Sequence, residues 1–139
     1  MLDIHITEFY NDVGRIFNRL YSQFPRQITL WVDEISGPDQ PDEYGMHSER
    51  YLATYSTILW LQQEGLLRFN DIDKQDAFNH CCLTLDSFRL LSGIAELAQE
   101  NERPIDLIRS ALKVQSSNQM EIVVAYILGS HRTSPGMVS

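Results

Sequence analysis

The stretch TILWLQQEGLLRF, residues 57–69, decides the fold predicted for this chain. Its first part continues a helical pattern that begins near Ser48, whose hydroxyl is suited to accept a backbone N–H at a helix start. Gly65 fits the left-handed position that commonly follows a helix, and an apolar pair comes directly after it. The stretch therefore predicts a helix from Ser48 to Glu64 that passes at once into a β-strand.

The residues after this stretch predict a hairpin and another helix. The polar run NDIDKQD, residues 70–76, has the composition of a hairpin tip, and residues 77–83 follow as a second strand. Thr84 is a predicted N-cap for the helix that comes next. The resulting order is helix, short β-hairpin, helix.

This order, with its Glu64-Gly65-Leu66-Leu67-Arg68 passage into the hairpin, resembles the winged helix-turn-helix superfamily over roughly residues 7–94. The resemblance implies that the helix from Ser48 is a recognition helix and that residues 70–76 form the wing. It also implies a set of residues that face DNA and contact base edges or phosphates. These are Arg50, Tyr51, Thr54, Thr57 and Lys74.

The rest of the chain is predicted to be mostly helical. Apolar residues from Phe9 to Phe24 repeat at spacings of three and four, and Pro25 stops that helix. Residues 27–30 suit a short strand, although Thr29 could instead cap a brief helix. Residues 37–47 form a loop that is rich in Pro and Gly.

Beyond the hairpin, Pro104 fits the first position of a helix, and residues 118–128 form an apolar helix that ends at Gly129. The β-branched run at 122–124 would also suit a strand. The predicted fold is α+β and mostly helical: a winged helix with a small β-hairpin wing and extra C-terminal helices. We assign 1–94 to the winged-helix domain, 95–129 to a helical extension and 130–139 to a disordered tail.

Composition indicates an ordinary soluble domain. The chain has 139 residues, of which 43% are hydrophobic and 22% charged, enough for a single core. No stretch approaches the ~20 apolar residues that cross a bilayer, and no signal peptide is visible, so we expect a cytoplasmic protein without a membrane partner. Cys81 and Cys82 are adjacent, which disfavours a disulfide between them and indicates packing.

Charge is the main argument against DNA. From Trp31 to Asn79, which spans the surfaces that a winged helix presents to DNA, ten acids face three bases, a balance of −7 within a total of −8. Non-specific DNA affinity depends on Lys and Arg that displace counterions from phosphates. The sequence therefore favours a protein partner with a basic face, unless the acids serve only solubility.

The function predicted first is a non-enzymatic regulatory or interaction module, for example a protein that neutralises a basic toxin or nuclease. A DNA-binding transcriptional regulator is the alternative. The partner-binding residues predicted for the first function lie on the loop, the start of the following helix and the wing. They are Asp39, Asp42, Glu43, Tyr44, Glu49, Asp71, Asp73 and Asp76.

Catalysis, metal binding and cofactor binding are not expected. The sequence has no Gly-rich phosphate loop, nucleophile elbow or spaced Cys and His pairs. Asp71 and Asp73 start like a calcium loop, but the later Gly and Glu of such a loop are missing.

A homodimer is the second partner that the sequence indicates. The apolar helix near the C-terminus must be covered, either by a second copy or by the first helix of the same chain. The residues predicted for a dimer contact are Met120, Val123, Val124 and Ile127.

Overall fold

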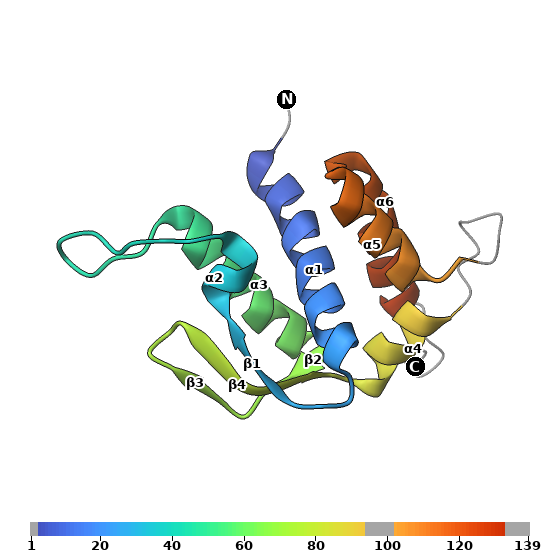
Figure 1. Cartoon of the computed structure of the whole chain (residues 1–139), viewed down its shortest axis with the longest axis horizontal. Helices are drawn as coiled ribbons and strands as arrows, with labels where there is room; N and C mark the ends of the chain where they lie inside the picture. Colours follow the sequence, from blue (N-terminus) through green and yellow to red (C-terminus); the bar gives the residue numbers. More distant parts are fainter. Residues whose placement is uncertain (1–2, 94–101, 133–139) are drawn as a thin grey trace.

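The structure, a computed structural model, describes residues 3–93 and 102–132. A long helix, α1 (Ile4–Gln23), runs through the middle of the molecule (Figure 1). On one side of it lie α3 (Glu49–Gln63) and a small sheet. On the other side lie α5 (Pro104–Val114) and α6 (Ser117–Arg132). The described chain is thus α+β and mostly helical, as predicted.

The sheet is antiparallel and is built around β4 (Ala77–Leu83). The strands β1 (Ile28–Trp31) and β2 (Leu67–Arg68) pair with opposite edges of β4, and β3 (Asp71–Asp73) forms a hairpin with it. A hairpin follows Gly65 as predicted, but its tip is shorter than residues 70–76, because residues 71–73 pair with β4 as the strand β3. In the segment after Pro25 the predicted strand is present as β1, and a short helix, α2 (Val32–Ser36), follows it. The predicted cap of that helix is wrong, because Thr29 lies inside β1 and Trp31 precedes α2.

Local capping explains where the helices around the hairpin begin and end. The Ser48 hydroxyl accepts the backbone N–H of Tyr51 at 3.2 Å, at the start of α3. Gly65 has a φ of 77° after the last turn, a conformation that costs glycine little. Thr84 caps α4 (Leu85–Ser92) by accepting the N–H of Ser87 at 3.4 Å. These three predictions from sequence are confirmed.

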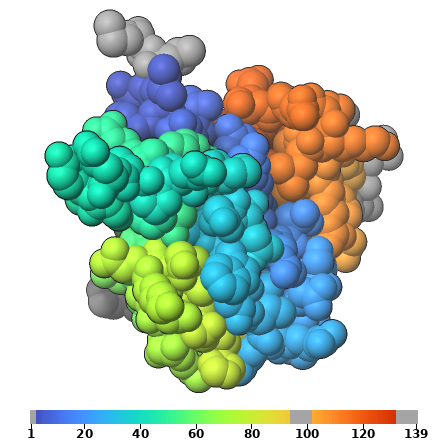
Figure 2. All heavy atoms as spheres, turned by 60° about the vertical axis from the view of Figure 1, so that its left-hand side comes forward, coloured from blue at the N-terminus to red at the C-terminus, as the bar shows by residue number. Residues whose placement is uncertain are grey.

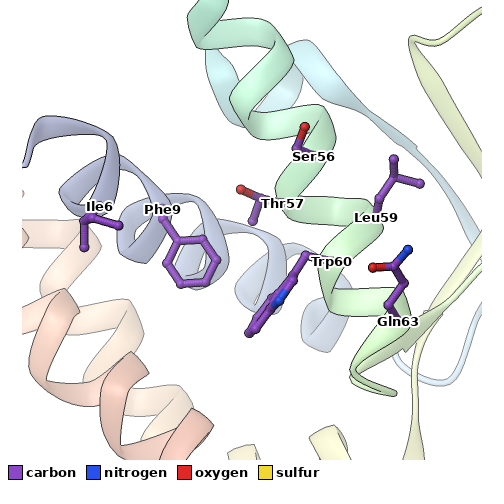
Figure 3. A pocket seen from close by; sticks show the side chains of 7 residues that line it. All are labelled: Ile6, Phe9, Ser56, Thr57, Leu59, Trp60 and Gln63. Atoms are coloured by element: carbon purple, nitrogen blue, oxygen red, sulfur yellow. The ribbon is translucent and has the colours of Figure 1, made fainter.

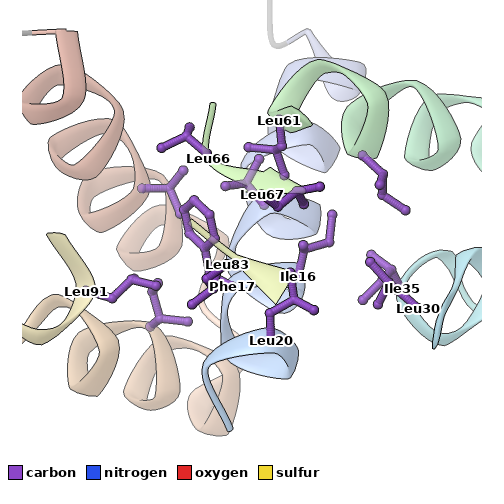
Figure 4. Close-up of a cluster of buried hydrophobic side chains, with 14 of the residues drawn as sticks. Ile16, Phe17, Leu20, Leu30, Ile35, Leu61, Leu66, Leu67, Leu83 and Leu91 are labelled. Atoms are coloured by element: carbon purple, nitrogen blue, oxygen red, sulfur yellow. The ribbon is translucent and has the colours of Figure 1, made fainter. Parts of the chain in front are cut away.

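One hydrophobic core joins the N-terminal and C-terminal parts of the chain. Its α1 side chains Ile16, Phe17 and Leu20 lie between the sheet, α3 and the C-terminal helices (Figure 4). The helices after residue 95 therefore belong to the same globule as the residues before 94. Within the described residues, no helix is long and apolar enough to cross a membrane.

The predicted dimer contact is wrong, because its four residues are buried inside the protomer. Met120, Val123, Val124 and Ile127 are at most 2% exposed, and α6 packs against α1 and α5. The contact with α1 is close: a Cβ added at Gly14 would lie 2.2 Å from the sulfur of Met120. The alternative, in which this helix packs back on the first helix, is confirmed.

The predicted end of the last helix is also wrong. α6 continues past Gly129 to Arg132, and residues 122–124 are helical rather than extended. Residues 130–132 of the predicted tail are therefore part of a helix, while 133–139 lie outside the described residues. A glycine late in a helix lowers helix propensity by only about 1 kcal/mol, which the packing of α6 offsets.

Candidate functional site

The loop 37–48, the adjoining first residue of α3 (Glu49) and the β3–β4 hairpin lie next to each other on one side of the molecule, and together they are called the acidic face below. Figure 2 shows the loop above the hairpin on this side. Tyr51, at the start of α3, connects the two segments, because its hydroxyl donates to the carbonyl of Gln75 at 3.1 Å. Burial raises the pKa of Tyr51 to about 12, with a further contribution from Asp76, so the hydroxyl stays protonated and able to donate.

The tip of the loop is an ordered turn that projects two apolar side chains. The Asp42 carboxylate accepts the N–H groups of Tyr44 and Met46, each at 2.9 Å. The backbone N–H of Asp42 also donates to the carbonyl of Met46 at 2.9 Å. Despite this order, Tyr44 is 82% exposed and Met46 is 60% exposed. The loop therefore holds both side chains away from the protein in a fixed turn.

The base of the loop is attached to α3 through Asp39. Its carboxylate lies 2.8 Å from Nδ1 of His47 and accepts the N–H of Ser48 at 3.4 Å. Hydrogen bonds from Ser48 and then from His47 lower the pKa of Asp39. The His47 ring stacks on Tyr51, with centroids 3.7 Å apart and planes 10° from parallel. The contact at Asp39 thus closes the loop over the start of α3.

The eight residues predicted for partner binding are placed on this face but differ in availability. Asp39 and Asp42 use their carboxylates to shape the loop, and Asp76 is half-buried. Asp71 is exposed and accepts a hydrogen bond from the side chain of Asn79 at 2.9 Å. The side chains that remain exposed for a partner are those of Glu43, Tyr44, Glu49, Asp71 and Asp73.

Arg50, the one base of α3, is turned toward α1. Its guanidinium donates through two nitrogens to the carboxylate of Asp12, which is only 1% exposed. It also donates to the Thr54 hydroxyl at 2.8 Å and lies 3.5 Å from Glu8. The hydrogen bonds to Asp12 raise the pKa of Arg50 above its ordinary value. This network fixes the rotation of α3 and keeps its base away from the outer surface.

The sequence-based expectation that Tyr51, Thr54 and Thr57 face outward is wrong. They are 3%, 0% and 6% exposed, because the polar network with α1 turns their side of α3 inward. Lys74 does lie at the exposed tip of the hairpin, with a φ of 52°. The predicted DNA-contacting residues are therefore not gathered on one surface.

The helices α1 and α3 also border an apolar pocket that the sequence did not indicate (Figure 3). The pocket has a volume of about 560 Å³, and α1 forms its second wall. Trp60 lies edge-on to Phe9 there, with ring centroids 5.3 Å apart. The side chains that line it are Ile6, Phe9, Ser56, Thr57, Leu59, Trp60 and Gln63.

Comparison of the chain with protein-family models, with curated proteins and with solved structures finds no match. Within residues 3–93 and 102–132, no three His, Cys, Asp or Glu side chains are grouped so that they could hold a metal ion.

Proposed function

We propose that this chain is a non-enzymatic protein-interaction module of the winged-helix type that binds a basic protein surface through its acidic face. The observation that carries the proposal is the ordered loop tip, which holds Tyr44 82% exposed beside the carboxylate of Glu43. An exposed tyrosine that is held in place is a frequent anchor of protein interfaces, because it adds contact area at low cost in side-chain entropy.

The charges around Tyr44 support a basic partner. Glu43, Glu49, Asp71 and Asp73 are exposed on the same face, and the bonds from Tyr51 to Gln75 and from His47 to Asp39 keep its two segments together. Complementary charge increases the association rate and selects among partners. An already ordered surface also loses less conformational entropy on binding.

A DNA-binding regulator is the second candidate, and the connectivity favours it. The order of α1, β1, α2 and α3, followed by a hairpin whose last strand pairs with β1 and β2, agrees with the winged-helix resemblance. The orientation of Arg50 weighs against this candidate, because its guanidinium is held by Asp12. We therefore rank DNA below protein.

A labelled oligolysine peptide tests the acidic face in fluorescence anisotropy at low and at physiological salt. The test variant Glu43→Gln/Glu49→Gln/Asp73→Asn removes three exposed charges from the face. The matched control Asp86→Asn/Glu102→Gln/Glu121→Gln removes three exposed charges elsewhere. A charge attracts the peptide strongly only when it lies near the bound peptide. We therefore expect the test variant to weaken binding at least about fivefold more than the control.

Equal weakening by the two triple variants would overturn the proposal, since it would mean that only net charge matters. A labelled DNA duplex, titrated in the same buffers, tests the second candidate. Saturable binding of the duplex that Lys74→Ala abolishes would place the regulator first.

A further inference from the structure

Three of the chain's eleven Lys and Arg residues lie where α1 and α5 meet, and a fourth follows one helical turn later on α5; they are called the basic furrow below: Arg15, Arg19, Arg109 and then Lys113. Arg109 is fixed across the two helices, because it donates to Asn18 at 2.9 Å and its guanidinium lies 5.4 Å from the centre of the Tyr21 ring. Two hollows of about 280 and 220 Å³ lie along the furrow, and both are lined by Arg15 and Leu112.

The basic furrow lies beside α2, from which the acidic loop continues. Arg15 donates to the carbonyl of Ile35 at 3.2 Å, and Arg19 pairs with Glu34 at 3.0 Å. Figure 2 shows the loop, α2, α1 and α5 following one another across the same side of the molecule. The acidic loop 37–48 and the basic furrow thus lie on the two sides of α2, on one surface of the molecule.

The two surfaces are opposite in charge. The loop 37–48 carries three carboxylates and no Lys or Arg. In the furrow, Glu34 pairs with Arg19 and the charge of Asp106 acts on Arg109, so four bases face two acids. Arg50 and Arg103, by contrast, are held by Asp12 and Asp106.

We infer that the basic partner of the acidic face is a second copy of this chain, whose furrow receives the loop. This inference rests on the proposed function. A two-fold axis close to α2 brings each loop onto the furrow of the other copy, because the two surfaces lie on either side of that helix. Such a pairing is isologous and closed, which is the commonest arrangement of homodimers. Tyr44 at each loop tip is placed to enter a hollow of the furrow, and the opposed charges lie around it.

The test is sedimentation velocity of the full chain at about 20 mM and about 300 mM NaCl, where the Debye length falls from roughly 20 Å to about 6 Å. We expect dimers at low salt and a dissociation constant at least about tenfold weaker at high salt. A loop-reversed variant, Gln40→Lys/Glu43→Lys/Glu49→Lys, and a furrow-reversed variant, Arg109→Glu/Lys113→Glu, change exposed residues. Each alone should be monomeric, because its loop and furrow then have like charge.

An equimolar mixture of the two reversed variants is the decisive sample. Each loop then meets a furrow of opposite charge, so heterodimers should form, which also demonstrates that both variants are folded. The variant Arg26→Glu/Arg89→Glu makes the same charge change as the furrow-reversed variant at exposed positions elsewhere. This control should still dimerise.

Monomeric wild-type protein at low salt up to about 100 μM would overturn the inference, since this concentration reaches the weak end of specific association. Dimers of either reversed variant alone, or no heterodimers in the mixture, would overturn it as well. The oligolysine experiment separates this failure from that of the proposed function. If the protein is monomeric but its acidic face still binds the peptide, the second copy is excluded as the partner and the proposed function stands.

Discussion

Two aspartates hold the start of α3, and the comparison between them separates what stabilises this protein from what shapes its surface. Asp12 binds Arg50 in the interface with α1 and is 1% exposed. Asp39 binds His47 at the base of the acidic loop, where the two side chains keep 11% and 21% of their surface exposed. The residues they bind are only three positions apart, yet one contact is inside the fold and the other is at its edge.

Burial determines how much each contact contributes. A carboxylate without water depends on its partner, so removing that partner from a buried pair typically costs 3–5 kcal/mol. A pair near water is screened, and its loss costs little. We therefore expect the Asp12 contact to control the folding of the whole domain, and the Asp39 contact to control only the loop.

The largest expected effect comes from Arg50→Met, which keeps the side-chain stem but leaves the carboxylate of Asp12 buried without its cation. The free energy of unfolding, measured by urea denaturation, should fall by about 3–5 kcal/mol. The control Arg68→Met removes an exposed Arg and should stay within about 0.5 kcal/mol of the wild type. If Arg50→Met were as stable as Arg68→Met, the contact between Asp12 and Arg50 would not stabilise the fold.

A smaller loss is expected from Thr54→Val, which keeps the shape of the side chain and removes the hydroxyl that donates to Asp12 at 2.9 Å. Loss of this hydrogen bond to a charged group should lower the free energy of unfolding by about 1.5–3 kcal/mol. The same substitution in the Arg50→Met background should have a different effect, because the residues share one network. Additive effects in this double-mutant cycle would contradict a coupled network.

Acid should open the loop before it unfolds the domain. Because the pKa of Asp39 is lowered in the folded loop, its contribution is present above the unfolded value of about 4 and is lost as pH falls through the lower folded value. The protection factor of the Ser48 amide, which donates to Asp39, should fall over that range when its exchange rate is divided into that of the unstructured chain at the same pH. In Asp39→Asn this protection factor should be low at every pH, and an undiminished wild-type protection factor at low pH would exclude the mechanism.

The smallest effect on stability is expected from Tyr44→Ala. The side chain is 82% exposed, so the free energy of unfolding should change by less than about 0.5 kcal/mol. The midpoint of thermal unfolding should therefore hardly move. Salt-sensitive dimerisation should nevertheless weaken by at least about tenfold, because Tyr44 is the proposed anchor. If Tyr44→Ala were destabilised but still dimerised normally, Tyr44 would contribute to folding and not to dimerisation, contrary to this prediction.

Local signals made the hairpin and its flanking helices predictable. Ser48, Gly65 and Thr84 act within a few residues of themselves, so their roles as caps are visible in the sequence. The projecting loop was indicated by its Pro and Gly content. Its internal order was not, because that order depends on which backbone groups the carboxylate of Asp42 reaches.

The rotation of α3 and the basic furrow could not be predicted from the sequence, because both depend on contacts between residues that are distant in the chain. The rotation of α3 depends on Asp12, which lies 38 residues before Arg50 in the chain. No pattern within α3 indicates that contact, so Thr54 and Thr57 were assigned to the wrong side. The basic furrow likewise joins α1 and α5, whose bases are distant in sequence and gather only in the fold.

The close packing of Gly14 against Met120 has a consequence for synthesis of the chain. The two residues are separated by about 100 positions, and a ribosome adds roughly 5–20 residues per second. The side of α1 that packs against α6 therefore stays uncovered for roughly 5–20 seconds before α6 is synthesised. During that interval the nascent chain exposes an apolar surface to which chaperones can bind and through which chains can aggregate. The same surface is buried in the folded protein.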